Sequence, residues 1–106
     1  MTALTDVADA VAAAATSVTG VTALSPGRFG EIATYGPGRR VSGVRLSDQG
    51  GEVHIEVSLV RNLLDVAEEV RVAAEKAAGR PMTVVVEDVS MDNDTPTTPA
   101  DSQDTV

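Results

Sequence analysis

The strongest constraint on how this chain can fold is a strand–helix–strand pattern in residues 53–89. Polar and apolar residues alternate over 53–59, the period of a strand with one buried face. Apolar residues then recur every three or four positions over 63–78, which predicts an amphipathic helix that Asn62 caps and Gly79 ends. A helix that joins two strands of one sheet makes a right-handed crossover between parallel strands, so the strand after this helix should lie parallel to the strand before it.

Three other segments complete the predicted sheet. Residues 44–46 alternate in polarity and precede a turn at 48–51, so they should pair antiparallel with the strand that follows. Residues 29–35 predict an edge strand, which the Gly36-Pro37-Gly38 turn ends. After the second helix, residues 82–89 are apolar on both faces, a pattern that favours a central strand.

The N-terminal segment predicts a first helix. Its apolar positions lie three to four residues apart from Leu4 to Val18, with Thr5 as the N-cap and Gly20 as the stop. Both helices carry more alanines than one apolar stripe needs. Close packing of the two helices is the first explanation, and a subunit interface is the second. The predicted fold is α/β (α+β): a two-layer sandwich of order α-β-β-β-α-β, in which two helices cover one face of a mixed four-stranded sheet.

Composition excludes several kinds of chemistry. The chain of 106 residues has no cysteine, which excludes a disulfide scaffold, a thiolate nucleophile, an iron–sulfur cluster and the usual structural zinc site. Its formal charge of −8 argues against binding along a phosphate backbone, so we expect no nucleic-acid partner. No apolar stretch approaches the ~20 residues of a membrane span. A soluble, cytoplasmic protein is expected.

The charge is unevenly distributed. Residues 90–106 contain four aspartates, no basic residue and almost nothing apolar, which predicts a disordered acidic tail after one domain of residues 1–89. Residues 28–45 contain four arginines and a single acidic residue, a local charge of +3. Such a surface would contact an acidic partner, an anionic lipid surface or the acidic tail. The candidate interaction residues are Arg28, Tyr35, Arg39, Arg40 and Arg45.

A single histidine limits the catalytic possibilities. Glu52, His54 and Glu56 should point to one face of their strand, about 7 Å apart in step, which suggests a metal site or an acid–base group. A solvated strand face with arginine partners on the next strand explains the same spacing. No second histidine and no cysteine completes a tight metal site. We therefore assign no catalytic, metal-binding or cofactor-binding residue, and keep a small enzyme or metal-binding protein as an alternative.

Two glycine-containing loops match anion-binding patterns. Residues 27–30 match the G-x-x-G loop that clamps a nucleic-acid backbone, and residues 36–40 offer backbone amides and two guanidiniums. The RNA-binding loop lies between two helices, whereas the residues after Gly30 look extended. Structural turns with solvated arginines explain both segments, and an RNA-binding module that uses the first loop stays as a second alternative.

The order and spacing of these segments over residues 4–89 resemble the alkaline-shock-protein family, small envelope stress response proteins of Gram-positive bacteria. Residues 30–41 look like the short high-GC branch of that family. The resemblance implies a non-enzymatic, cytoplasmic protein that self-associates into a homo-oligomer, has a role in cell-envelope homeostasis and makes only indirect membrane contact, through a membrane-anchored partner. It brings no catalytic residue. It rests on the segments Val18-Thr19-Gly20-Val21, Gly43-Val44, Val53-His54-Ile55-Glu56-Val57, Val66-Ala67-Glu68-Glu69-Val70-Arg71-Val72-Ala73 and Val84-Val85-Val86-Glu87-Asp88-Val89.

Overall fold

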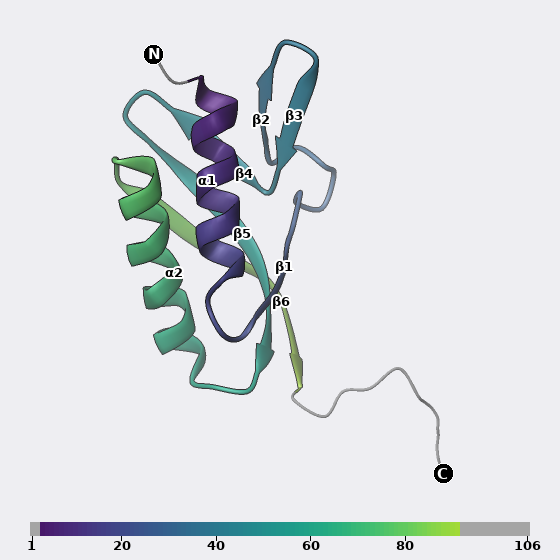
Figure 1. Ribbon diagram of the computed structural model, residues 1–106. Helices are drawn as coiled ribbons and strands as arrows, with labels where there is room; N and C mark the ends of the chain where they lie inside the picture. Colours follow the sequence, from purple (N-terminus) through teal and green to yellow (C-terminus); the bar gives the residue numbers. More distant parts are fainter. Residues whose placement is uncertain (1–2, 92–106) are drawn as a thin grey trace.

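Two helices pack side by side on one face of a mixed four-stranded sheet (Figure 1). The computed structural model describes residues 3–91 of the chain. A hairpin stands apart from the main sheet as a second, two-stranded sheet. The predicted α+β fold, with both helices on one face, is confirmed. The elements are α1 (Leu4–Thr16), β1 (Val21–Leu24), β2 (Ala33–Gly36), β3 (Arg39–Ser42), β4 (Val44–Ser47), β5 (Gly50–Leu59), α2 (Leu63–Ala78) and β6 (Met82–Met91).

The main sheet is organised around β5. On one edge, β6 pairs with β5 in parallel along almost its whole length. On the other edge, β4 pairs antiparallel with the first half of β5 and β1 with the second half. The predicted hairpin and the predicted parallel pair are therefore confirmed. The prediction that residues 82–89 form a central strand is wrong, because β6 is an edge strand whose Val84 and Val86 face the helices while Val85 lies beside His54.

The first strands differ most from the prediction. Residues 27–30 form a turn closed by a hydrogen bond from Gly30 N–H to the Gly27 carbonyl, so the strand predicted over 29–35 is wrong. The extended segment begins only at Ala33 and pairs with β3, outside the main sheet. The place at the sheet edge belongs to β1. The pattern predicted neither β1 nor β3. The element order is α-β-β-β-β-β-α-β, which has two strands more than the predicted order α-β-β-β-α-β.

The two helices begin in different ways. Asn62 caps α2 as predicted, since its Oδ1 accepts hydrogen bonds from the N–H groups of Leu64 and Asp65 at 2.9 and 3.2 Å. The predicted cap of α1 is wrong. The helix begins at Leu4, its N-cap residue Ala3 has no side-chain acceptor for the first N–H groups, and Thr5 is buried. Its methyl group lies where a side chain on Gly36 of β2 would be. Thr5 thus packs the hairpin against α1 and is unavailable as a cap.

The helix ends also differ. Gly79 ends α2 in the left-handed conformation, as predicted. However, α1 ends at Thr16, so the predicted stop at Gly20 is wrong. Gly20 instead allows a close approach, because a Cβ on it would lie 3.0 Å from Val66 of α2.

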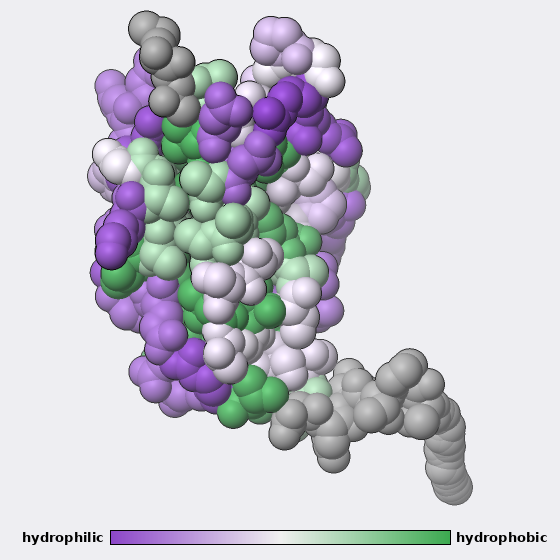
Figure 2. Space-filling model, viewed as in Figure 1, coloured by the Kyte–Doolittle hydropathy of each residue, from purple (hydrophilic) through white to green (hydrophobic). Residues whose placement is uncertain are grey.

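Valines, alanines, two isoleucines and Met82 build the core. Ile55 and its neighbours on β5 are fully buried beneath both helices, and alanines at the contacts let α1 and α2 approach closely. Neither aromatic residue takes part: Phe29 is 86% exposed and Tyr35 66%. In Figure 2, the middle of the helix face carries apolar residues and its margins carry hydrophilic ones.

The C-terminal strand runs further than predicted. It continues to Met91, two residues beyond the predicted end of the domain, and the Ser90 hydroxyl donates a hydrogen bond to the carbonyl of Val57. The remainder of the predicted acidic tail lies outside the described residues. Within residues 3–91, no helix is long and apolar enough to cross a membrane.

The cap of α2 gives a first prediction. Substituting Asn62→Ala should lower the free energy of unfolding by about 1 kcal/mol, because two N–H groups of the first turn lose their acceptor. Asn62→Asp keeps an acceptor oxygen at the same place and should stay close to the original stability. Urea unfolding followed by circular dichroism measures both. Equal losses in the two variants would contradict the capping role.

Candidate functional site

Two of the five candidate arginine and tyrosine residues bind the chain's own acidic side chains. Arg39 pairs with Asp6 and Asp9, and so fastens the β2–β3 hairpin to α1. Arg45 pairs with Glu52, its direct neighbour across the β4–β5 ladder, at 3.0 Å between Nη2 and Oε2. Exposed ion pairs of this kind each add about 0 to 1 kcal/mol of stability. The guanidinium groups of these two arginines therefore already have partners within the fold.

The other three candidate residues face outward. Alternation along β2 turns Thr34 inward, where its hydroxyl donates to the Val44 carbonyl at 2.6 Å, and turns Tyr35 outward. Arg40 lies directly opposite Tyr35 in the hairpin. Arg28 is exposed in the turn that precedes the hairpin. Neither Arg28 nor Arg40 forms an ion pair with another residue of 3–91.

The loop at residues 27–30 holds the most exposed large apolar side chain of the described chain, Phe29. Gly27 and Gly30 both have positive φ values, and the Phe29 N–H donates to Glu31 Oε1 at 3.0 Å. This loop follows β1 and leads to β2. It therefore lacks the two flanking helices that an RNA-clamping G-x-x-G loop requires.

We call the outward-facing set the basic-aromatic arm. It consists of Arg28, Phe29, Tyr35 and Arg40. Arg28, Tyr35 and Arg40 are among the residues predicted from the sequence, whereas Phe29 is not. The signal that could have found it is its position between two glycines in a turn, where a large apolar side chain has no neighbour to cover it.

A second polar group is centred on His54 of β5. Its ring is buried, with Nε2 2.8 Å from Glu52 Oε1 and Nδ1 2.5 Å from Glu87 Oε2. Of the two glutamates predicted to flank the histidine, only Glu52 contacts it, and Glu56 does not. Glu87 comes from β6, 33 residues further along the chain, through the parallel β5–β6 pairing.

These contacts occupy the histidine. The hydrogen bond from His54, followed by that from Arg45, lowers the pKa of Glu52 below its usual value of 4.5. Each ring nitrogen faces its own carboxylate oxygen, so neither is free to bind a metal. Residues 3–91 hold no group of three or more histidine, aspartate or glutamate side chains arranged to hold a metal ion.

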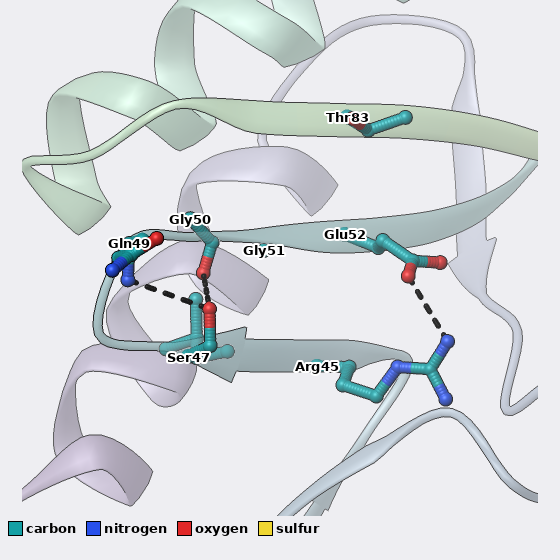
Figure 3. A pocket seen from close by; sticks show the side chains of 8 residues that line it. Arg45, Ser47, Gln49, Gly50, Gly51, Glu52 and Thr83 are labelled. Carbon is teal, nitrogen blue, oxygen red and sulfur yellow. Dashed lines mark hydrogen bonds and ion pairs between the residues drawn. The ribbon is translucent and has the colours of Figure 1, made fainter.

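The surface also offers a shallow hollow at the β4–β5 turn (Figure 3). Its polar groups satisfy one another: Arg45 pairs with Glu52, and the Ser47 hydroxyl donates to the Gly50 carbonyl. None converges on a common point as donors do in a ligand pocket. This hollow gives no support for a substrate site.

Comparison with known proteins adds the fold. No protein-family description matches the chain, and no curated protein matches it. Among solved structures, "MamM CTD - Copper form" superposes with a TM-score of 0.51 at 16% identity, over 92% of this chain and 96% of that one. Two variants of the same domain give TM-scores of 0.49 and 0.45 at 17% and 18% identity. The first likeness shows that this α+β arrangement also occurs in an experimental structure.

Proposed function

We propose that this protein is a non-enzymatic, self-associating scaffold of the cell-envelope stress response, held on the cytoplasmic side of the membrane by a membrane-anchored partner. The biological setting comes from the resemblance to the alkaline-shock-protein family. The physical support comes from the surface of the molecule, where groups suited to binding proteins are free and groups suited to acid–base chemistry are engaged with each other.

The observation that carries the proposal is the exposure of both aromatic side chains. Burying a large apolar side chain stabilises a fold by about 1.5 to 3 kcal/mol, yet Phe29 and Tyr35 stay outside a core of small residues. Aromatic residues and arginine are enriched at protein interfaces and at their energetic centres. The basic-aromatic arm combines both. We assign it to the membrane-anchored partner, which should present an acidic, apolar surface.

The alternatives find less support in the same residues. An enzyme or metal protein would use His54, but both of its ring nitrogens already contact carboxylates. An RNA-binding module would use the loop at residues 27–30 together with nearby arginines. However, Arg39 of the segment 36–40 is paired with Asp6 of α1, and the overall charge is −8. A scaffold requires neither a free histidine nor a basic groove.

The arm gives a second prediction, tested in the organism that makes the protein. The double variant Phe29→Ser with Tyr35→Ser should leave the membrane fraction and appear in the supernatant after cell lysis, because the anchoring contact is lost. Val72→Ser removes a comparable exposed apolar side chain from α2 and should remain with the membranes. Immunoblots of both fractions measure the distribution, and thermal unfolding checks that each variant folds.

Two results would contradict the proposal. One is an original protein that sediments as a monomer throughout the micromolar range and is absent from the membrane fraction. The other is a double variant that stays with the membranes in the same proportion as the original protein. That result would show that the basic-aromatic arm does not make the anchoring contact.

A further inference from the structure

The outer edge of β6 is open from Thr83 onward. β6 pairs only with β5 among residues 3–91, while the far edge of β5 is taken by β4 and β1. Alternate residues of β6 therefore direct their backbone N–H and C=O groups away from the sheet, whereas the N–H of Met82 donates to Glu75 Oε2 at 3.1 Å. Such an edge is a template for another strand unless charge, proline or a bulge protects it.

The two halves of β6 differ in this protection. The second half has a bulge after Val86, and Glu87 and Asp88 add charge at the same place. The first half, from Met82 to Val86, has neither a charge nor an irregularity. Bulges and charges are the devices that keep edge strands from pairing. Only the first half of β6 is left free to pair.

A groove runs beside this unprotected half. It lies between α2 and β6 and has a volume of about 510 Å³. Leu64 lines it with 77% of its surface exposed, and Glu68 and Arg71 add one charge of each sign. Its other lining residues are Ala67, Met82, Thr83 and Val84. The open edge therefore continues into an apolar surface that a second layer could cover.

We propose that this edge binds a second copy of the chain through a two-fold axis at Val84, so that the two main sheets become one. The proposal rests on the self-association in the proposed function and names the surface that performs it. In this pairing the first half of β6 runs antiparallel to itself: Val84 lies opposite Val84 of the second copy, and Thr83 lies opposite Val85 of the second copy.

The occupant follows from self-complementarity. A segment that pairs with itself must bring no like charges together, and the uncharged run 82–86 meets this condition. Centring the axis on Val84 also keeps the Glu87 bulge outside the paired region. Beside the axis, the charges of the groove are already paired within one copy, because Arg71 binds Glu68 and Glu75, so they set no unpaired like charges against the second copy. An unrelated strand would have no reason to match this symmetry.

Single cysteines test the register, because the natural chain has none. Directly opposed residues of antiparallel strands have Cα atoms about 4.5 to 5.5 Å apart, within the reach of a disulfide. Val84→Cys should therefore form covalent dimers under mild oxidation. Thr83→Cys alone should not, since its own copy lies diagonally at about 7 to 8 Å. A mixture of the Thr83→Cys and Val85→Cys proteins should form the mixed dimer.

Charge substitutions test the interface without a cross-link. Thr83→Lys with Val85→Lys sets two pairs of like charges across the axis and should weaken dimerisation about tenfold, measured by analytical ultracentrifugation. Thr83→Lys with Val85→Glu sets opposite charges at the same positions and should restore it. A loss of folding alone would not distinguish these two variants.

The results separate this inference from the proposed function. Cross-linking at Val84 together with the charge rescue supports the β6 interface. A protein that self-associates, but neither cross-links at Val84 nor responds to the lysine pair, overturns the interface and leaves the scaffold proposal in place. A protein that is monomeric throughout the micromolar range overturns both.

Discussion

Substituting Gly43→Ala should lower the free energy of unfolding by about 3 kcal/mol or more, a large fraction of the 5 to 15 kcal/mol typical of a natural domain. Gly43 has a φ of +89°, where an L side chain is strained. An added Cβ would also lie 2.6 Å from Cβ of Leu24, a distance at which the backbone must move. Strain and overlap act together at this one position.

Gly38→Ala provides the matched control. Its φ is +72°, but a Cβ there would meet nothing within 4 Å. This variant should show only the strain of the left-handed conformation, about 1 to 2 kcal/mol. Urea unfolding of both variants separates strain from overlap. Equal losses would show that β1 and the β3–β4 junction are less closely packed than the structure indicates.

Gly43 also connects the arm to the sheet. Its N–H donates to the Ile32 carbonyl at 2.7 Å, and its own carbonyl accepts from His54 N–H at 2.9 Å. The hairpin therefore depends on a residue at which two sheets meet. We expect Gly43→Ala to increase proteolytic cleavage within residues 27–38 under conditions in which the rest of the domain stays folded. Binding of the proposed partner by the basic-aromatic arm should weaken under the same conditions.

Local signals explain which parts of the fold could be predicted. The Asn62 cap, the 63–78 period and Gly79 lie within one segment, so the second helix is correct at both ends. β1 has only four residues and no clear alternation of burial. It is an edge strand held by distant contacts, such as the hydrogen bond from the Thr22 hydroxyl to the Glu56 carbonyl. Its existence depends on the finished sheet, which no local pattern encodes.

The candidate site shows the same division. Tyr35 and Arg40 could be named as surface residues from the sequence, but the β2–β3 hairpin that sets them opposite each other was not predicted. The pairing of Arg39 with Asp6 joins residues 33 positions apart, and it depends on how the hairpin docks on α1. Likewise Glu87 reaches His54 only because β6 is parallel to β5 and in this register. The spacing along β5 predicts Glu56 as a partner of His54, whereas the β5–β6 register places Glu87 beside the ring.

Substituting His54→Leu should destabilise the protein by about 2 kcal/mol at neutral pH, since hydrogen bonds to charged groups are worth about 1.5 to 3 kcal/mol and water replaces part of them here. Glu52 keeps its pair with Arg45, whereas Glu87 loses the histidine. Adding Glu87→Gln to this variant removes the unpaired charge and should recover part of the loss. Glu56→Gln changes a glutamate on the same strand that does not touch the ring and should have little effect.

The pH dependence of that loss identifies its cause. The histidine lowers the pKa of Glu52 in the folded state, so this contribution to stability is complete above the unfolded-state pKa and disappears as the pH falls through the lower folded-state value. The His54→Leu variant lacks the largest cause of the lowered pKa and should lose less stability in acid. The unfolding free energies of the two proteins should therefore converge as the pH falls. A difference that stays constant with pH would mean that the ring acts through packing alone, and that its hydrogen bond with Glu52 contributes nothing measurable.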